Sequence, residues 1–264
     1  MTDERELFTG TAYYYAKYRL GYPKEFFDYV IRYYGLGGNG RLLDLGCGTG
    51  QITIPLAKYF GEAIGLDPEK EMLDEAQKET ERARATNIKW VLKKAEEISE
   101  ELGYFRLTTM GASFHWMDQE KVLAKIYNLM EQGGGLVIVS DSSSPWRGER
   151  EERWNELRKQ IVQKYLGETR RAGDSYYVEP KERFETLLER SPFGKFEVFT
   201  HGYTQEWTIE SVIGFLFSTS FASRRLFGER VPEFEQELKD ELLKLEPSGR
   251  FAEQVQVEAL LARK

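Results

Sequence analysis

Three glycines alternate within a stretch of eight residues, and an acidic side chain precedes them. The stretch DLGCGTGQ begins at Asp44 and places glycine at Gly46, Gly48 and Gly50. Glycine lets the backbone turn sharply and approach a ligand closely, and N–H groups at the start of a helix suit an anionic or polar group. Asp67 follows at roughly the distance expected for an acid that holds ribose hydroxyls. The pattern therefore predicts a loop that binds a nucleoside-containing ligand.

Two other interpretations of this loop remain open. The dinucleotide fingerprint G-x-G-x-x-G requires glycine where this chain has Gln51, so a nicotinamide-dependent oxidoreductase is the less favoured alternative. A tight strand-to-helix turn that binds no ligand is the other. Cys47 is the only cysteine, so no internal disulfide can form, and a reducing compartment fits. No base accompanies it, and we expect it to fill space in the loop rather than act as a nucleophile.

A histidine that could take part in catalysis lies in the stretch ASFHWMD, residues 112–118. His115 is one of two histidines in the chain. It could act as a general base for a hydroxyl group or orient a carboxylate. Alternatively, it is a half-buried histidine that fixes its loop through a backbone hydrogen bond. Trp116 is expected to pack rather than react.

The stretch TAYYYAKYRLGYP, residues 11–23, contains five tyrosines together with Lys17 and Arg19. A guanidinium group can bind a carboxylate with two parallel hydrogen bonds, and aromatic rings attract cations and exclude water. The alternative is a surface helix whose tyrosines pack on the sheet. Tyr13 and Tyr14 cannot both face the same way, so at least one of them is structural.

Strands and helices must alternate to position these residues. Short apolar runs predict five strands, and helical patterns lie between them. Strands that alternate with helices predict a parallel sheet covered on both faces, with ligands beyond the carboxyl ends of the strands. We also expect a helix in 51–60, helices that begin at Asp67-Pro68 and at Asp118, and an apolar helix within 206–228. The five strands predicted from apolar runs are 41–45, 62–66, 88–92, 104–110 and 136–140. The last two strands, an antiparallel hairpin typical of such a fold, are expected at 196–200 and 255–261.

The amino-acid composition of the chain limits the kinds of partner that it can bind. The chain has 264 residues, of which 41% are hydrophobic and 31% charged, as in ordinary globular proteins. Its net charge of −7 argues against a nucleic-acid or anionic-membrane surface. No apolar run approaches eighteen residues, and the first ten residues lack an apolar core. We expect a cytoplasmic protein that binds no nucleic acid, no membrane and no metal.

The heptapeptide DLGCGTG resembles the S-adenosylmethionine loop of class I methyltransferases. Asp44, Gly46, Gly48, Gly50 and Asp67 match that family's pattern. The resemblance implies that Asp67 binds the ribose hydroxyls and that the glycine loop passes beneath the methionine part of the cofactor. It also implies S-adenosylhomocysteine as the product. The implied fold is α/β and Rossmann-like, with a seven-stranded, mostly parallel sheet and an antiparallel C-terminal strand.

The third predicted loop, LKKAEEI at 92–98, also resembles its counterpart in this family. The resemblance implies that the Ala95 N–H and Glu96 meet the adenine. The family often has an acid where this chain has Lys94, which cannot accept a hydrogen bond from the adenine amino group. The alternative for Glu96 is a solvated acid in the first turn of a helix.

Two further stretches resemble the ubiquinone-biosynthesis and trans-aconitate methyltransferases, a type 11-like group. One is Phe114-His115-Trp116 after the fourth strand. The other is an N-terminal segment that matches at Phe8, Ala12, Tyr15, Arg19, Tyr22 and Pro23. The resemblance implies a lid in which Tyr15 and Arg19 lie near the methionine carboxylate and the acceptor. It also places Phe114 at the cofactor and gives His115 and Tyr15 catalytic roles.

These observations predict one methyltransferase domain over 1–264. S-adenosylmethionine would donate a methyl group to a small-molecule acceptor by in-line displacement, at oxygen or carbon and possibly at a carboxylate. A non-catalytic protein that binds S-adenosylmethionine is a further alternative. The sequence does not predict the oligomeric state. The predicted segments are an N-terminal lid (1–35), a cofactor-binding core (41–141), a helical cap insertion (146–190) and C-terminal strands and helices (196–264).

Overall fold

The computed structural model describes residues 7–142, 152–180 and 182–264. The chain forms two compact units, each made of three separate stretches. The sheet unit contains Gly21–Asp141, Glu179–His201 and Val257–Lys264, and the helical unit contains Met1–Leu20, Ser142–Val178 and Gly202–Gln256. The predicted cap is therefore divided between the units, and its residues 146–151 and 181 lie outside the described residues. The single-domain organisation stays a prediction.

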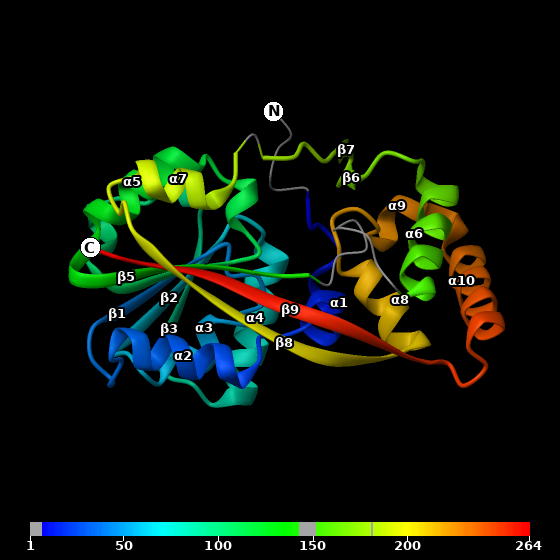
Figure 1. The fold of residues 1–264 in the computed structure, drawn as a ribbon, viewed down its shortest axis with the longest axis horizontal. Coiled ribbons are helices and arrows are strands. Elements are labelled where there is room, and N and C mark those ends of the chain that lie inside the picture. The colour runs from blue at the N-terminus through cyan, green and yellow to red at the C-terminus, as the bar shows by residue number, and fades with distance from the viewer. Residues whose placement is uncertain (1–6, 143–151, 181) are drawn as a thin grey trace. The chain divides into compact units, whose positions relative to one another are not determined.

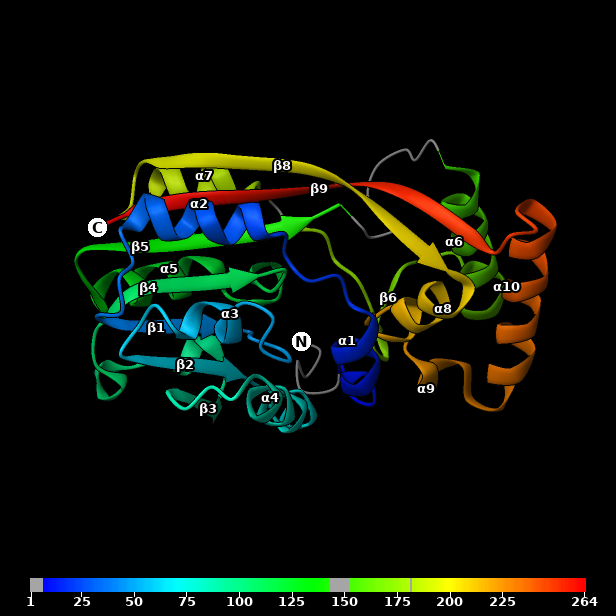
Figure 2. The same ribbon diagram turned by 90° about the horizontal axis from the view of Figure 1, so that it is seen from below.

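A seven-stranded sheet forms the centre of the sheet unit, in the order β3-β2-β1-β4-β5-β9-β8 (Figures 1 and 2). The first five strands pair in parallel, and β9 runs antiparallel to β5, with Val137 opposite Leu261. The predicted fold class is confirmed. The strands are β1 (Arg41–Leu45), β2 (Glu62–Asp67), β3 (Ile88–Leu92), β4 (Phe105–Gly111), β5 (Met130–Asp141), β8 (Phe196–Thr208) and β9 (Arg250–Arg263).

Helices cover both faces of this sheet. In Figure 1, α5 (Gln119–Asn128) and α7 (Phe184–Arg190) lie on one face, and α2 (Lys24–Tyr34) and α3 (Thr53–Ala57) lie on the other. Alternate residues of the strands point to one face, so Leu43 and Leu45 share a core with Val122 of α5 and Leu188 of α7. On the opposite face, the Tyr34 hydroxyl donates to the carbonyl oxygen of Leu136 at 2.8 Å. Because the first five strands are parallel, their carboxyl ends lie at one edge of the sheet.

Three predicted details of the sheet unit need correction. The helix expected in 51–60 is only α3, because its last turn tightens through i to i+3 hydrogen bonds, such as that from the Phe60 N–H to the Ala57 carbonyl. Asp67 is not the N-cap of α4 (Lys70–Ala83), because Glu69 holds that position and donates its N–H to the Asp67 carboxylate. The final two strands extend well beyond 196–200 and 255–261, since the alternating burial continues along them. The Asp118 N-cap of α5 is confirmed.

The helical unit has its own aromatic core. It contains the predicted apolar helix, α8, whose residues Phe215 and Phe217 are buried with Trp154 of α6 and Phe234 of α10. A short hairpin, β6 (Arg171–Ala172) and β7 (Ser175–Tyr176), completes the unit. Among the described residues, no helix has the length and apolar character needed to cross a membrane. The helices are α1 (Ala12–Tyr18), α6 (Arg153–Leu166), α8 (Ile209–Phe217), α9 (Arg224–Phe227) and α10 (Val231–Leu245).

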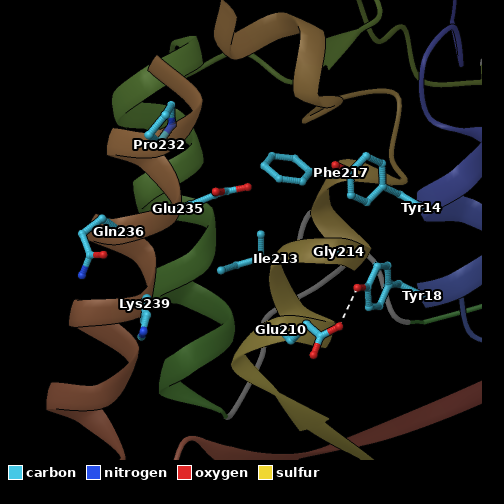
Figure 3. A pocket seen from close by; sticks show the side chains of 10 residues that line it. All are labelled: Tyr14, Tyr18, Glu210, Ile213, Gly214, Phe217, Pro232, Glu235, Gln236 and Lys239. Atoms are coloured by element: carbon cyan, nitrogen blue, oxygen red, sulfur yellow. Dashed lines mark hydrogen bonds between the residues drawn. The ribbon is translucent and has the colours of Figure 1, made fainter. Parts of the chain in front are cut away.

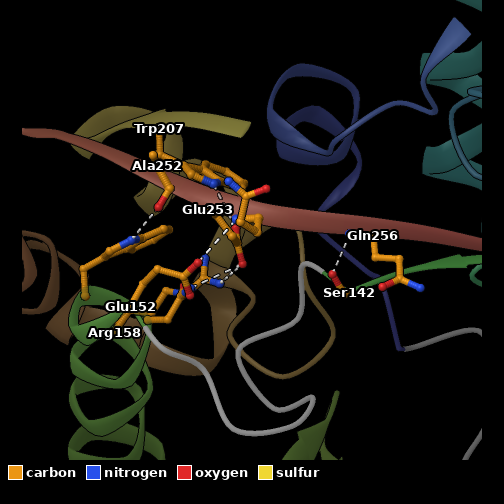
Figure 4. A network of polar contacts seen from close by, with 10 residues as sticks. Ser142, Glu152, Arg158, Trp207, Ala252, Glu253 and Gln256 are labelled. Carbon is orange, nitrogen blue, oxygen red and sulfur yellow. Dashed lines mark hydrogen bonds and ion pairs between the residues drawn. The ribbon is translucent and has the colours of Figure 1, made fainter. Parts of the chain in front are cut away.

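A buried ion pair connects α6 to β9 within the helical unit (Figure 4). The side chains of Arg158 and Glu253 are both fully buried, and Arg158 Nη2 lies 3.5 Å from Glu253 Oε1. Trp207 Nε1 donates to Glu253 Oε2 at 2.9 Å, and the Arg158 guanidinium lies 4.7 Å from the ring centre of Trp154. Aromatic stacking and these hydrogen bonds thus offset part of the cost of removing water from both charges.

Candidate cofactor site

The glycine loop between β1 and α3 depends on the absence of side chains. Gly46 has a φ of +63°, a conformation that side chains disfavour, and its N–H donates to the Leu66 carbonyl oxygen at 2.8 Å. A Cβ on Gly46 would lie 2.5 Å from the Cβ of Ser113, and one on Gly50 would lie 2.9 Å from the Trp90 ring. The loop is therefore pressed against β2, β3 and the segment after β4.

Asp67 ends β2 with its carboxylate directed by two backbone donors. Its Oδ2 accepts from the Gly48 N–H at 2.9 Å, and its Oδ1 accepts from the Glu69 N–H at 2.9 Å. The residue is only 8% exposed. Burial raises the pKa of Asp67 to about 6, although the two N–H groups act in the opposite direction. Each oxygen keeps a second lone pair, which suits two adjacent hydroxyl groups.

Asp44 is even more buried, and its carboxylate is bound by two hydroxyl groups of the protein. Thr53 donates to its Oδ2 at 2.6 Å and Thr109 to its Oδ1 at 2.8 Å, and the residue is 1% exposed. Burial raises the pKa of Asp44 to about 6, against the effect of both hydroxyls. Asp44 thus ties the start of the loop to α3 and β4. A direct contact with the cofactor stays a prediction.

The loop after β3 contains both residues that were predicted to meet adenine. Ala95 is buried and begins the 3₁₀ helix η2 (Ala95–Glu97). Glu96 Oε1 accepts the backbone N–H of Asp118 at 2.7 Å. Glu96 thereby connects this loop to the segment after β4, which its sequence position did not indicate. The adenine contacts of Ala95 and Glu96 stay predictions.

The segment after β4 contains His115 and begins beside the glycine loop, where Ser113 bonds to Leu45. Ala112 has a φ of +51°, which is uncommon for a residue with a side chain. Phe114 is 1% exposed and packs against the Phe184 ring with ring centres 4.9 Å apart, so its placement favours packing. His115 is half-buried in η4 (Phe114–Trp116), with its ring centre 4.6 Å from that of Trp116. A contact of Phe114 with the cofactor and a catalytic role of His115 both stay predictions.

Tyr15 and Arg19 belong to the helical unit, where α1 packs on α8, whereas residues 21–35 of the predicted lid belong to the sheet unit. The Arg19 guanidinium lies 5.0 Å from the Tyr15 ring centre and 5.2 Å from that of Phe215. Tyr14 and Tyr18 point toward α8 and line a groove of about 500 Å³ together with α10 (Figure 3). These two tyrosines are therefore packing residues. The predicted contacts of Tyr15 and Arg19 with the cofactor stay predictions.

Two residues that could have had chemical roles are structural. Burial raises the pKa of the Cys47 thiol well above its usual value, so the thiol stays protonated. Arg106 donates to the Gly133 carbonyl oxygen at 2.8 Å and the Tyr34 carbonyl oxygen at 3.0 Å. It fastens α2 and the start of β5 to β4.

Sequence reasoning missed four residues that shape the site: Thr53, Thr109, Ser113 and Trp90. No local pattern marks them, because each acts through a neighbour distant in sequence. Together with Asp67 and the glycines they form a tightly packed turn at the carboxyl ends of β1 and β2. The backbone of this turn leaves no room for side chains, and two backbone N–H groups direct the Asp67 carboxylate, whose remaining lone pairs suit ribose hydroxyls. The contact of Asp67 with ribose stays a prediction. The residues present therefore fit S-adenosylmethionine.

Comparisons with known proteins agree with this fit. A family model described as a methyltransferase domain matches residues 42–134. A probable S-adenosylmethionine-dependent methyltransferase of Saccharomyces cerevisiae is 29% identical over 46% of this chain and 42% of its own length. The matched stretch thus spans less than half of that relative. An uncharacterised methyltransferase of Schizosaccharomyces pombe is 26% identical over 91% of this chain and 88% of its own length.

A solved structure shares the fold. It is a Haemonchus contortus phosphoethanolamine N-methyltransferase in complex with S-adenosylhomocysteine, similar with a TM-score of 0.57 and 17% identity. The alignment covers 100% of this chain and 61% of that one. The narrower resemblance to the ubiquinone-biosynthesis and trans-aconitate type stays a prediction. The methyltransferase domain at 42–134, these relatives and the shared fold together support a class I S-adenosylmethionine-dependent methyltransferase.

Proposed function

We propose that this protein transfers the methyl group of S-adenosylmethionine to the oxygen or carbon of a small-molecule acceptor, with carboxylates among the candidates. One observation carries the proposal most directly. The Gly48 N–H and the Asp67 carboxylate are 2.9 Å apart, so the glycine loop and the ribose-binding acid form one preorganised surface. The segment with His115 begins beside the same loop, because Ser113 hydrogen-bonds to Leu45.

The bound cofactor supplies a methyl group on a sulfonium, which is already a good leaving group. The protein therefore has to align the acceptor and exclude water rather than activate the donor. Asp67 holds the ribose through its two carboxylate oxygens. His115 removes a proton from a hydroxyl acceptor or orients an acceptor that is already ionised. Tyr15 and Arg19 hold the methionine carboxylate from the lid.

Charge supports a small acceptor over a macromolecule. The net charge of −7 disfavours a polyanionic partner such as a nucleic acid. An acidic protein can still bind a small anion where a single arginine is directed at it. Arg19 lies near two aromatic rings, which restricts its guanidinium to few orientations. Soluble, cytoplasmic action on a metabolite-sized molecule is therefore the function we expect.

The test combines ligand binding with turnover. The purified protein would be incubated with methyl-labelled S-adenosylmethionine and a panel of small carboxylates, phenols, alcohols and enolisable carbon acids. Label transfer, with the product identified by mass spectrometry, would establish both the activity and the methylated atom. The variant Asp67→Asn is the control, and it should lose transfer by losing cofactor affinity.

Two results would contradict the proposal in different ways. Binding of S-adenosylhomocysteine without transfer to any acceptor of the panel would favour the non-catalytic alternative. A stabilising shift in Tm with NADH and none with S-adenosylhomocysteine would favour an oxidoreductase. At a hundred times the dissociation constant, a true ligand stabilises the protein by about 2.7 kcal/mol, which a thermal melt detects easily.

A further inference from the structure

We propose that Ser113 and Glu96 are positioning residues that hold the His115 segment between two cofactor-binding loops. The inference rests on the proposed function for the role of His115. It adds a physical link between cofactor binding and the acceptor side of the site. The segment 114–117 lies between Ser113, which bonds to the glycine loop, and Asp118, which bonds to Glu96 in the loop after β3.

The first anchor joins the segment to the glycine loop. Ser113 Oγ donates to the Leu45 carbonyl oxygen at 2.7 Å, and Ser113 is 8% exposed. Leu45 immediately precedes Gly46, and the close approach at Gly46 places the serine side chain directly against the loop backbone. The Met117 methyl group also approaches this point, at 3.3 Å from a Cβ built on Gly46. A change in the backbone at Gly46 must therefore move Ser113.

The second anchor joins the segment to the loop after β3. Glu96 Oε1 accepts the backbone N–H of Asp118 at 2.7 Å, a short bond between an N–H group and a charged acceptor. Asp118 is also the N-cap of α5, since its side chain accepts from the Lys121 N–H at 3.3 Å. Glu96 thus fixes the residue at which the segment turns into a helix.

The backbone conformation of Ala112, just before Ser113, shows that the surrounding structure fixes the position of the His115 segment. Ala112 has a φ of +51°, which costs free energy for a residue with a Cβ and persists only where the surroundings enforce it. Its N–H donates to the Val139 carbonyl oxygen at 2.8 Å, so β5 holds it in register. Ser113, the residue directly after the strained Ala112, donates its hydroxyl to the Leu45 carbonyl oxygen. The segment is therefore held at both ends.

This arrangement predicts that ordering of the two cofactor loops also orders the segment with His115. The anchors should consequently affect turnover more than cofactor affinity. Two substitutions at Glu96 can separate its role as an anchor from an effect of its charge on adenine binding. Gln at this position keeps an oxygen that can accept the Asp118 N–H, whereas Ala keeps none.

The first experiment is hydrogen exchange by mass spectrometry on the full chain, which needs no acceptor. Ser113→Ala and Glu96→Ala should raise the exchange rate of peptides that cover 113–118 by roughly tenfold or more. Glu96→Gln should resemble the wild type, and so should Glu101→Ala, which removes an exposed acid from η3 (Glu100–Leu102). Unchanged exchange in both anchor variants would overturn the proposal.

The second experiment is a kinetic cycle with an acceptor from the panel. Ser113→Ala and Glu96→Ala should both lower kcat at least tenfold, and in Ser113→Ala the Kd for S-adenosylhomocysteine should change less than about threefold. Neither should lower kcat further in a His115→Ala background, because both act through that residue. Equal losses in Glu96→Gln and Glu96→Ala would instead assign Glu96 to a charge-dependent contact. Full activity of His115→Ala would refute the role of His115, while the exchange data would still test the anchors.

Discussion

Lowering the pH should weaken the binding of S-adenosylhomocysteine, because the proposed ribose contact requires an ionised Asp67 that accepts hydrogen bonds from both hydroxyls. Burial raises the pKa of Asp67 to about 6. The ionised fraction is then about 0.9 at pH 7 and about 0.1 at pH 5. A protonated carboxyl loses one of its acceptor positions. If only the ionised form binds tightly, Kd should rise about tenfold between pH 7 and pH 5.

Isothermal titration calorimetry over pH 5 to 8 would measure this change. Two buffers with different ionisation enthalpies would also reveal the proton released on binding near pH 6. Asp67→Asn should bind S-adenosylhomocysteine weakly at every pH, and its Kd should not change with pH. A Kd that stays constant within twofold from pH 5 to pH 7 would refute the reasoning. The reasoning would also be refuted if the pH dependence of Kd disappeared in Asp44→Asn but persisted in Asp67→Asn. Asp44 would then be the responsible group, since its pKa is also about 6.

The raised pKa also has a consequence for the protein without its ligand. Between its ordinary pKa of 3.8 and about 6, Asp67 is protonated in the folded state and ionised in the unfolded state. Its contribution to stability is therefore present at low pH and is lost as the pH rises through 6. The free energy involved is about 3 kcal/mol at pH 7. Asp67→Asn should accordingly have a higher Tm than the wild type at pH 7.5, and this advantage should vanish near pH 4.

Three other variants or reactions test the packing described above. Gly214→Ala should lower Tm by several degrees, because its Cβ would lie 2.3 Å from a tyrosine ring of α1, whereas Gly202→Ala, with open space around it, should not. Glu253→Ala should destabilise the protein by about 3–5 kcal/mol, since it leaves the Arg158 charge buried, and urea unfolding would measure the loss. A loss below about 1 kcal/mol would mean that water reaches the arginine. Cys47 should react with thiol reagents only on unfolding, because burial raises its pKa, and rapid labelling of the folded protein at pH 8 would contradict this.

Local patterns predicted the sheet and the glycine loop well. Each parallel strand is a short apolar run next to a turn signal, so its identity depends on neighbouring residues alone. The three glycines and Asp67 are likewise linked by their distance along the chain. The N-cap at Asp118 was predicted because capping involves residues three positions apart.

The remaining features depend on contacts that no local pattern encodes. The Asp44 carboxylate is bound by Thr109, which is 65 positions away in sequence, and Glu96 bonds to Asp118 at a separation of 22. Asp67 resembled an N-cap because its sequence neighbours suit that role, but its carboxylate also binds Gly48. The tyrosine segment was ambiguous for the same reason. Which rings are structural depends on the space that Gly214, having no side chain, leaves beside α8 for the Tyr18 ring.

The strand order has a consequence for synthesis on the ribosome. β9 is the last strand of the sheet in sequence, yet it lies between β5 and β8. Its residues from Val257 onward pair with β5, from which more than a hundred residues separate them. During translation, β5 therefore exposes an unpaired edge while nearly half of the chain is still being made. Such long-range pairing slows folding and leaves an aggregation-prone intermediate. Nascent chains halted before β9 should be the form that most needs chaperones.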